Sequence, residues 1–518
     1  MKKIIIMAVA TAMAVSGMAQ ETYEMANIAT QDLNGTARYV GMGGAMDALG
    51  ADISTINSNP AGVGLFRKSQ AAVSFGFVSQ ADANETMDVS PTRMSFDQAG
   101  FVLSTNTSGK KNSFLNFAFN YSKSRNFSQI LEAANSLKGS SQNMQTFGKI
   151  RSGIVETADD ATFSQADYLY MNTNGTGLLN ALYDTCYAAT AYGMSRGTKG
   201  YIGEYDFNLS GNIQNRLFLG ITFGIKDVHY EHGSCYGETL VDAAGNLLPV
   251  EMEDERIITG TGFDVKVGAI VRPIETSPFR VGLTIGSPTF YTLRSSNYTR
   301  LTAEDMGSLS IDESYRYKMN TPWNFGLSVG HTIGQNIALG LGWNYADYSY
   351  LSPRVDDGDY YDEWGDIYSQ SHQDKAMKHN VKACLKGVHT LKAGVEVKPI
   401  PEFAVRLGYN YVTAMYKDNA YRDPSVWSDG VYYSSQTDFT NWKGTNRFTV
   451  GMGYTSGNFY ADVAYQCQMR KGDFYPFTSG TFNWTNDEGQ NVSISNTPTI
   501  TEVKDTRHQL LLTLGYKF

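Results

Sequence analysis

Two short motifs contain residue types that could perform catalysis or bind a metal. Residues 326–330 read GLSVG and match the GxSxG pattern of serine hydrolases. That pattern needs its serine on a sharp turn between a strand and a helix, whereas Ser328 alternates with Leu327 and Val329 inside a strand-like run. We therefore expect no hydrolase, and no other constellation in the chain supports an enzyme.

The second motif, HYEHGSC, places His229, His232 and Cys235 close together. These residue types bind zinc or haem. No second ligand cluster can be placed beside them from the sequence, so we expect a polar loop, with a haem receptor kept as an alternative. The acidic run 356–366 lacks the EF-hand spacing and predicts a solvated loop. The sequence thus predicts no metal site and no cofactor.

A glycine-rich segment, residues 41–66, resembles a phosphate-binding loop at first sight. It fails the GxGxxG template because position 46 is Met46, and no Gly-Lys-Ser/Thr follows it. The four cysteines, at positions 186, 235, 384 and 467, all map to predicted outer loops or outer strand ends. Four cysteines allow three pairings, and the sequence does not choose among them.

Composition and the first residues restrict the protein class. The chain has 518 residues, a net charge of -9 and no basic tract, so we expect no nucleic-acid partner. Aromatic residues make up 13% and charged residues 18%, which together with 51 glycines favours an all-β protein. Lys2, Lys3, the apolar run 4–15 and small residues before Gln20 predict a signal peptide at 1–19.

Two-residue alternation of apolar and polar residues recurs along the chain. In QNIALGLGWNY, Ile337, Leu339 and Leu341 share one face with Trp343 and Tyr345. Fourteen such segments of membrane-spanning length predict a transmembrane 14-stranded antiparallel β-barrel. They cover residues 70–80, 94–104, 113–123, 201–212, 216–226, 262–272, 278–287, 322–332, 335–345, 388–398, 402–412, 446–454, 457–468 and 508–518.

The spacers between these segments alternate between short and long, as expected for a barrel with short periplasmic turns and long extracellular loops. The last segment ends at Phe518, and a final amphipathic strand with an aromatic terminus resembles the signal read by the barrel assembly machinery. We therefore expect the cell outer membrane of a Gram-negative-type envelope as the location and outer-membrane lipid as a partner.

The two faces of the segments predict opposite environments. Aromatic side chains near segment ends fit the interfacial girdles of a barrel. Charges on the other face must point into a polar lumen, because Arg or Lys facing lipid costs about 2–4 kcal/mol at the midplane. The aromatic positions are Trp323, Trp343, Tyr345, Tyr409 and Tyr411, and the charged positions are Arg216, Lys226, Asp264, Lys266, Arg280, Lys392, Glu396, Arg406 and Asp462.

An open lumen of fourteen strands would leak, and residues 20–69 precede the first strand with no evident place outside. Their glycines allow close backbone approach. We therefore predict that residues 20–69 form a hatch inside a barrel of residues 70–518.

GGAMDAL from residue 43, and NPAG at 59–62, followed by the first of fourteen strands, resemble the FadL-type outer-membrane transporters of long-chain fatty acids and other hydrophobic compounds. The resemblance implies a hatch, extracellular capture of a hydrophobic molecule and exit through a lateral opening in the wall. The hatch positions that it implies are Gly43, Gly44, Ala45, Asn59, Pro60, Ala61 and Gly62.

The loop 124–200 is unusually long, and it carries apolar residues at helical spacing from Phe127 to Leu137. We expect a partly helical loop that captures hydrophobic ligand or caps the barrel. The candidate capture residues are Ile130, Leu131, Leu137, Leu178, Leu179, Leu182 and Tyr183.

Together these features predict a passive outer-membrane channel for hydrophobic compounds, with long-chain fatty acids as the class implied by the resemblance. Because each buried CH₂ contributes about 0.8 kcal/mol, partition would favour long chains. The alternative is a FadL-like scaffold whose loops bind protein cargo, as in secretion-system shuttles.

Overall fold

The computed structural model describes residues 21–107, 113–153, 164–171, 186–242, 244–303, 307–361, 367–423, 426–428, 434, 437–486 and 488–518. The predicted signal peptide and the candidate capture residues Leu178, Leu179, Leu182 and Tyr183 lie outside this part of the chain. Among the described residues, no helix combines the length and the apolar character needed to cross a bilayer.

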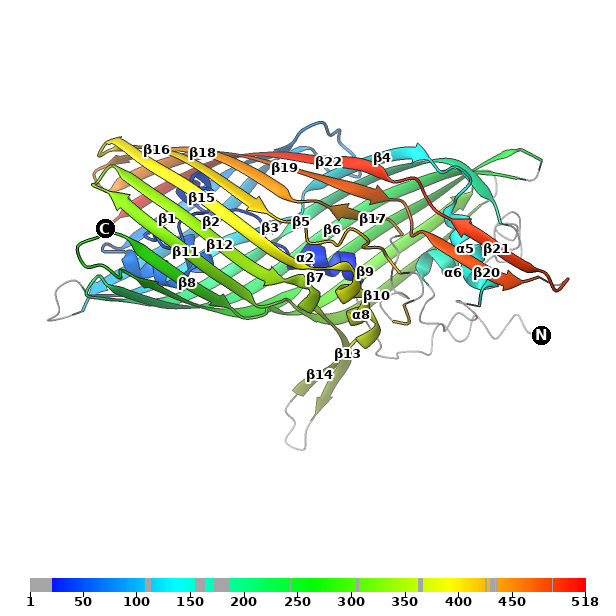
Figure 1. Cartoon of the computed structure of the whole chain (residues 1–518), viewed down its shortest axis with the longest axis horizontal. Helices are drawn as coiled ribbons and strands as arrows, with labels where there is room; N and C mark the ends of the chain where they lie inside the picture. The colour runs from blue at the N-terminus through cyan, green and yellow to red at the C-terminus, as the bar shows by residue number, and fades with distance from the viewer. Residues whose placement is uncertain are drawn as a thin grey trace.

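One antiparallel sheet closes on itself to form the wall (Figure 1). The last strand, β22 (Thr501–Lys517), pairs with the first, β1 (Gln70–Gln80), from Lys517 opposite Gln70 to Arg507 opposite Gln80. Within the described residues the wall has fourteen strand positions, which confirms the predicted fold. Between these two strands the order is β2 (Thr92–Asn106), β3 (Phe114–Asn126), β5 (Ala188–Ile213), β6 (Leu217–Val241), β7 (Leu247–Val271), β8 (Arg280–Gly286), β11 (Asn324–Ile333), β12 (Ile337–Asp347), β15 (Gly387–Ile400), β16 (Phe403–Val412), β18 (Thr445–Ser456) and β19 (Phe459–Tyr475).

Two neighbouring wall strands are interrupted at the same level. β8 continues outward as β9 (Phe290–Ala303), and β11 is preceded by β10 (Gly307–Asn320). The register that joins β8 to β11 also joins β9 to β10, which places Pro288 opposite Pro322. Proline has no N–H to donate, so the backbone hydrogen bonds between the two strands are interrupted at this level. The Thr321 amide donates to the Thr289 carbonyl and the Thr289 amide to the Thr321 hydroxyl, which closes the break.

The outer ends of several strands extend far beyond the predicted segments. β5 has 26 residues, and β6 and β7 have 25 each. The predicted long loops between 226 and 262 and between 287 and 322 are therefore wrong, because both regions are largely antiparallel hairpins. The alternation of short and long connections comes partly from these hairpins rather than from loops.

Most of the remaining outer elements lie toward the end of the molecule away from the C-terminus, and β13 and β14 project from its side (Figure 1). Residues 129–136, predicted as helix, form strand β4, which pairs with β5, so that prediction is wrong. The acidic run from residue 356 begins in a strand rather than in a loop. The outer elements are β4 (Gln129–Ser136), α5 (Gln142–Arg151), α6 (Gln165–Met171), η2 (Tyr348–Tyr350), β13 (Ser352–Tyr361), β14 (Ile367–Gln373), α8 (Lys375–Cys384), β17 (Phe439–Trp442), β20 (Gly480–Thr485) and β21 (Asn491–Asn496).

The wall strands alternate as the sequence predicts, with apolar side chains outside and polar side chains inside. On β6, Leu219, Phe223 and Ile225 are exposed on the outer face, whereas Thr222 and Lys226 are buried on the inner face. A continuous belt of exposed apolar side chains is stable in contact with lipid rather than water. The described barrel is therefore of the outer-membrane type.

Replacing a belt residue with a charged one should destabilise the barrel strongly. Leu341 of β12 is 57% exposed on the outer face, so Leu341→Arg would place a guanidinium in lipid and cost about 2–4 kcal/mol. Leu247 is 66% exposed at the outer tip of the β6–β7 hairpin, and Leu247→Arg should change stability by less than about 0.5 kcal/mol. Denaturant titration in lipid vesicles measures both values. Equal destabilisation by the two variants would contradict the membrane assignment of the belt.

The N-terminal segment, defined here as residues 21–66, lies inside the barrel (Figure 1). It consists of α2 (Thr22–Ala29), α3 (Ala37–Gly41), α4 (Thr55–Ser58) and the 3₁₀-helix η1 (Pro60–Leu65). Side chains cap these short elements: the Thr36 hydroxyl accepts the Tyr39 amide, and Asn59 Oδ1 accepts the Ala61 amide. Pro60 opens η1, where a missing N–H is tolerated.

Glycines on the inner face of the wall make room for this segment. A Cβ atom at Gly340 would overlap the Ala45 carbonyl, and one at Gly394 would overlap the Met42 carbonyl. Similarly, a Cβ at Gly220 would overlap the backbone of Pro60. Because each of these glycines lacks a side chain, the backbone of the segment packs directly on the backbone of the strands.

Candidate functional site

The predicted hatch positions lie at the contacts between the N-terminal segment and the wall. Gly43 and Gly44 have φ angles of 62° and 75°, a conformation that favours glycine. A Cβ on Gly43 would lie 2.7 Å from the Tyr409 amide nitrogen. Ala45, Asn59, Pro60, Ala61 and Gly62 are all buried. Their role in a movable hatch stays a prediction.

Ion pairs and hydrogen bonds hold the segment to the inner face. Glu396 Oε2 lies 3.0 Å from Arg38 Nε and 2.6 Å from Arg406 Nε, and Arg406 also pairs with Asp462 at 2.5 Å. Lys392 Nζ lies 3.0 Å from Asp47 Oδ2. Similar contacts join Lys266 to Asn57 and Arg280 to the Leu49 carbonyl. The prediction that these wall charges face the lumen is confirmed.

One member of the predicted set of lumen charges is placed differently. Arg216 lies in the short turn between β5 and β6, where its side chain is exposed and 3.8 Å from Glu275. The alternation that ends at Leu217 had suggested an inward position. The side chain of a turn residue does not follow the two-residue alternation of a strand, so the lumen assignment of Arg216 is wrong.

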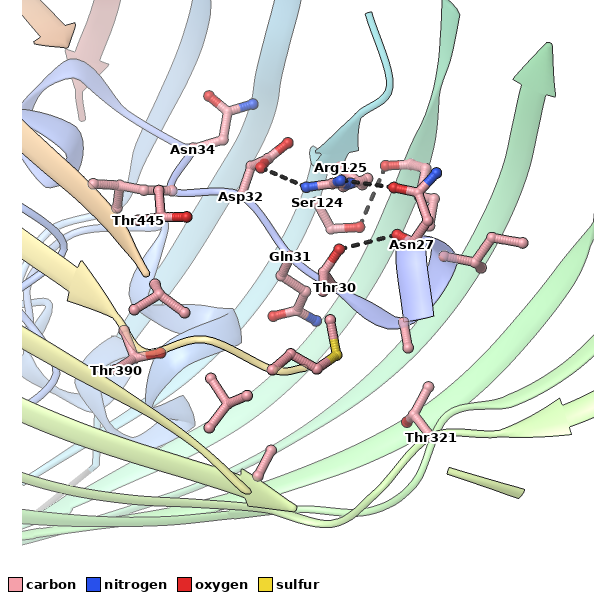
Figure 2. Close-up of a pocket in the computed structure, with 18 of the residues that line it drawn as sticks. Asn27, Thr30, Gln31, Asp32, Asn34, Ser124, Arg125, Thr321, Thr390 and Thr445 are labelled. Carbon is pink, nitrogen blue, oxygen red and sulfur yellow. Dashed lines mark hydrogen bonds and ion pairs between the residues drawn. The ribbon is translucent and has the colours of Figure 1, made fainter. Parts of the chain in front are cut away.

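A cavity of about 370 Å³ lies between the N-terminal segment and the outer half of the wall. Figure 2 shows part of it, with Asp32 and Asn34 of the segment facing Ser124 and Arg125 of β3. Among the described residues that line the cavity, nine are basic and four are acidic. This surplus of positive charge contrasts with the net charge of -9 for the whole chain.

Four arginines form one side of this cavity, which we call the arginine face: Arg125 of β3, Arg447 of β18, Arg470 of β19 and Arg507 of β22. Each side chain is largely buried. Arg470 Nε donates to Asp505 Oδ2 at 2.8 Å. Antiparallel pairing of β19 with β22 sets these two residues opposite one another.

Asp32 of the N-terminal segment reaches into the arginine face (Figure 2). Its Oδ1 lies 2.9 Å from Arg125 NH1 and 3.8 Å from Arg447 NH2, and its Oδ2 accepts the Asn126 amide at 2.9 Å. Burial alone would raise the pKa of Asp32, but Arg125, Arg507 and Arg447 outweigh it and lower the pKa to about 2. Asp32 is therefore a carboxylate at neutral pH.

Aromatic side chains lie beside the arginines. Tyr23 of the segment stacks on Tyr416 with ring centroids 5.0 Å apart, and its centroid is also 5.0 Å from that of Phe439. The Arg470 guanidinium lies over the Trp442 ring, 4.1 Å from its centroid. The cavity thus joins an apolar, aromatic side to a cationic one.

Next to the cavity, the wall contains a seam, defined as the boundary between residues 92–97 of β2 and 123–126 of β3. The β2–β3 ladder runs from Asn106 opposite Phe114 only to Gln98 opposite Ser122. In the described residues no backbone pairing joins the two strands beyond that point. Each strand also has a β-bulge there: the bulge of β2 interrupts its pairing with β1, and the bulge of β3 interrupts its pairing with β5.

Side chains bridge the seam where the backbone does not. Asn34 Nδ2 donates to Asp97 Oδ1 at 3.0 Å and to the Lys123 carbonyl at 3.1 Å. The Asp32 amide donates to the Ser124 carbonyl at 2.9 Å, beside the bridge. On the outer side, Met94 is 71% exposed and Phe96 is 43% exposed. The seam therefore lies at the level of the lipid belt and is closed from within by the N-terminal segment.

The structure separates the residues of the predicted metal or haem motif. His229 and His232 lie on strand β6 rather than in a loop, and they point to opposite sides of the wall. His229 pairs with Asp227 outside, and His232 lies 3.1 Å from Asp254 inside. The two imidazoles therefore cannot bind the same iron. Among the described residues, no group of three potential ligands converges.

Other predicted candidates are buried in the structure. Ile130, Leu131 and Leu137 are at most 5% exposed, and the last two belong to an apolar cluster of the outer elements. Ser328 lies within β11, where its hydroxyl faces the Gly282 carbonyl at 3.4 Å. All four cysteines are free thiols in the structure.

The sequence alone does not predict the arginine face or the role of Asp32 in it. The signal that could have found Arg447, Arg470 and Arg507 is their inward parity on strands that were otherwise recognised, because each lies on the buried face of its strand. Their convergence required the register between strands, which alternation does not supply.

No protein-family model matches the sequence, and neither does any curated protein. Among solved structures, the chain is similar to a Pseudomonas aeruginosa FadL homologue, with 12% identity, a TM-score of 0.48 and coverage of 94% of this chain and 99% of that one. It is also similar to the Ralstonia pickettii toluene transporter TbuX (10% identity, TM-score 0.48, coverage 94% and 99%) and to the Pseudomonas putida toluene transporter TodX (10%, 0.48, 95% and 100%). The assignment of the barrel rests on the strand pairings themselves.

Proposed function

We propose that this protein is an outer-membrane channel for passive uptake of hydrophobic and amphipathic compounds, with long-chain fatty acids as the first class to test. The observation that carries the proposal is the internal cavity, which lies above a segment that fills the lumen and beside a seam at the lipid belt. An outer-membrane pore for polar solutes needs a continuous aqueous path, which the N-terminal segment occupies here.

In this proposal a compound is captured at the outer elements and passes into the cavity. It leaves sideways through the seam after the N-terminal segment rearranges. Sideways exit suits an apolar molecule because its chain moves from protein into the lipid core without crossing water. Signal-peptide cleavage after Ala19 and recognition of the strand ending at Phe518 by the barrel assembly machinery belong to the same proposal.

Locking the seam tests this route. Phe96 borders the seam on β2, and Tyr121 lies on β3 in the paired ladder just beside it, with stacked rings 5.8 Å apart, so Phe96→Cys with Tyr121→Cys allows a short covalent cross-link at the edge of the seam. With the four native cysteines replaced by serine, the oxidised protein should lose oleate uptake in cells that depend on it, and reduction should restore uptake. Cells with the empty vector set the baseline.

A matched lock on a continuous part of the wall is the control. Phe119 and Phe207 are directly opposite on β3 and β5, with ring centroids 5.1 Å apart, and their ladder is unbroken there. Their double cysteine variant should transport equally well oxidised or reduced. Full uptake by the oxidised Phe96–Tyr121 variant would exclude the seam as the exit. If the protein without a cross-link gave no more uptake than the empty vector, the channel function itself would be refuted.

A further inference from the structure

Helix α8 presents a group of lysines at the side of the barrel (Figure 1). Lys375, Lys378 and Lys382 recur at helical spacing, and Lys386 follows just after the helix. Lys375 and Lys382 are exposed, whereas Lys378 and Lys386 are half-buried. Lys417 lies against the same helix, because its ammonium group donates to the Lys382 carbonyl. We call these five residues the lysine row.

The opposite face of α8 packs on the interior of the protein. Met377, Val381 and Cys384 are at most 2% exposed and belong to an apolar cluster that includes Met25 of α2. The Asp374 side chain accepts the Met377 amide at 2.9 Å and caps the start of the helix. The helix is therefore amphipathic and fixed in position, with its lysines directed away from the apolar cluster.

The helix lies close to the outer end of the lipid belt. Only two residues separate α8 from β15, whose first residue is Gly387. A Cβ on Gly387 would lie 2.6 Å from the hydroxyl oxygen of Tyr345, and the neighbouring Trp343 donates from its Nε1 to His389 Nδ1 at 3.1 Å. Tyr345 and Trp343 belong to the aromatic girdle. Because three residues of chain span at most about 11 Å, the end of α8 lies at the height of the lipid head groups.

The wall is low on this side of the molecule. β12 ends at Asp347, only two residues beyond Tyr345, whereas β6 continues to Val241, far beyond Ile225 of the lipid belt. Figure 1 shows α8 beside the base of the β13–β14 hairpin rather than at the distant end of the long strands. The lysine row therefore lies near the membrane surface, unlike the tips of the long hairpins.

Carboxylates are scarce around the lysine row. Residues 375–387 contain no acidic residue. Asp374 is buried as the cap of the helix, and Asp418 is exposed to solvent. The ion pairs that lysines form within the described residues all involve lysines outside this row. The row is thus a local surplus of positive charge in a chain whose net charge is -9.

Lys378 shows how weakly this surplus is compensated. Its ammonium group donates to the backbone carbonyls of Ser349 and Leu351, at 2.9 and 2.7 Å, rather than to a carboxylate. Burial lowers the pKa of Lys378 to about 8, and repulsion by Lys382 acts in the same direction. An anion supplied from outside the chain would relieve this repulsion.

We propose that the lysine row binds the phosphate groups of a lipid in the outer leaflet of the membrane. Lysine suits this ligand because its compact ammonium group binds phosphate oxygens as a point charge, and lysines beside a membrane are attracted to anionic head groups. The acyl chains of such a lipid would run along the exposed belt below, past Leu391 and Leu341. Tyr350, 67% exposed and 5.7 Å from the Lys378 ammonium group, supplies an interfacial ring at the same height.

Two forms of lipid A test the phosphate part of the proposal. The diphosphoryl and monophosphoryl forms share an acylated disaccharide and differ by one phosphate. With the full-length protein in a mild neutral detergent, native mass spectrometry should show tighter binding of the diphosphoryl form. Raising ammonium acetate from about 0.05 to about 0.2 M should weaken this binding, because salt screens exposed charges. Equal affinity for the two forms would overturn the proposal.

Variants of α8 test the position of the site. Lys375→Gln with Lys382→Gln should weaken binding of diphosphoryl lipid A about thirtyfold, since each lysine near an anionic surface contributes about fivefold. Lys375→Arg with Lys382→Arg keeps the charge and should bind as the wild type does. The matched control, Lys138→Gln with Arg300→Gln, removes the same charge from exposed positions on the outer elements and should also bind normally.

Free phosphate provides the last comparison. Inorganic phosphate, added at the same phosphate concentration as the lipid, should not displace diphosphoryl lipid A, because it lacks the acyl chains that follow the belt. Displacement would show that the row binds free phosphate and would overturn the lipid assignment. Equal binding by the α8 glutamine variant and the control variant, both with the faster gel mobility of a folded barrel before boiling, would exclude the lysine row as the site.

Discussion

Removal of residues 21–66 is expected to convert a closed barrel into an open, water-filled pore. The segment fills the lumen and packs on inner-face glycines such as Gly340 and Gly394. A wall of fourteen strands is wider than the eight-stranded barrels that side chains can fill, and it approaches the porins that conduct ions. In planar bilayers, single-channel conductance should rise by at least an order of magnitude over the full-length protein.

A milder change should act in the same direction without deleting any residue. Gly340→Leu places a side chain where the Ala45 carbonyl now lies, so it should displace the segment and raise conductance. Gly211→Leu is the control, since a Cβ there meets nothing within 4 Å. Unboiled samples should keep the faster gel mobility of a folded barrel in all three variants. Unchanged conductance in a folded deletion variant would show that the segment does not close the pore.

Glu396→Gln is expected to cause the largest loss of stability among single substitutions at the lumen. Its carboxylate lies between the guanidinium groups of Arg38 and Arg406, and the Glu396 and Arg406 side chains are almost fully buried. Removing one partner of a buried ion pair leaves an uncompensated charge and costs about 3–5 kcal/mol. Unfolding by guanidinium chloride in lipid vesicles should show this decrease, together with faster proteolysis of the N-terminal segment.

An exposed pair of the same residue types provides the comparison. Glu253 of β7 pairs with Arg300 of β9 on the outer hairpins, where both side chains are more than one third exposed. Solvent screens this pair, so Glu253→Gln should cost at most about 1 kcal/mol. Similar losses for Glu253→Gln and Glu396→Gln would mean that the Glu396 network is hydrated and does not anchor the segment.

The strands within the lipid belt could be predicted from the sequence because lipid imposes a sharp contrast between the two faces. On β6 the outer face changes from Phe223 and Ile225 to Asp227 and His229. Beyond Asp227 the outer face meets water, whereas inner-face residues such as Val228 and Leu240 pack in apolar clusters with the outer elements. The contrast that lipid imposes is therefore lost although the strand continues. The sequence therefore predicts a loop for the region from 227 to 241.

Local spacing fails to predict the conformation of residues 127–137 for a related reason. Ile130, Leu131 and Leu137 satisfy a helical period, yet pairing with β5 decides the conformation of this stretch as a strand. Pairing partners distant in sequence override local preference. The candidate site could not be predicted, because Asp32 of the inserted segment, Arg125 of β3 and Arg507 of β22 are brought together only by the strand registers and by the position of the segment in the lumen.

The length of the outer hairpins determines where a solute first meets this protein. A strand of 25 residues such as β6 measures about 80 Å along its axis and, at a tilt of about 40°, rises roughly 60 Å. The apolar belt accounts for only about 25 Å of that height. The remainder, roughly 35 Å, stands above the headgroups and places the rim of the outer hairpins far from the lipid core.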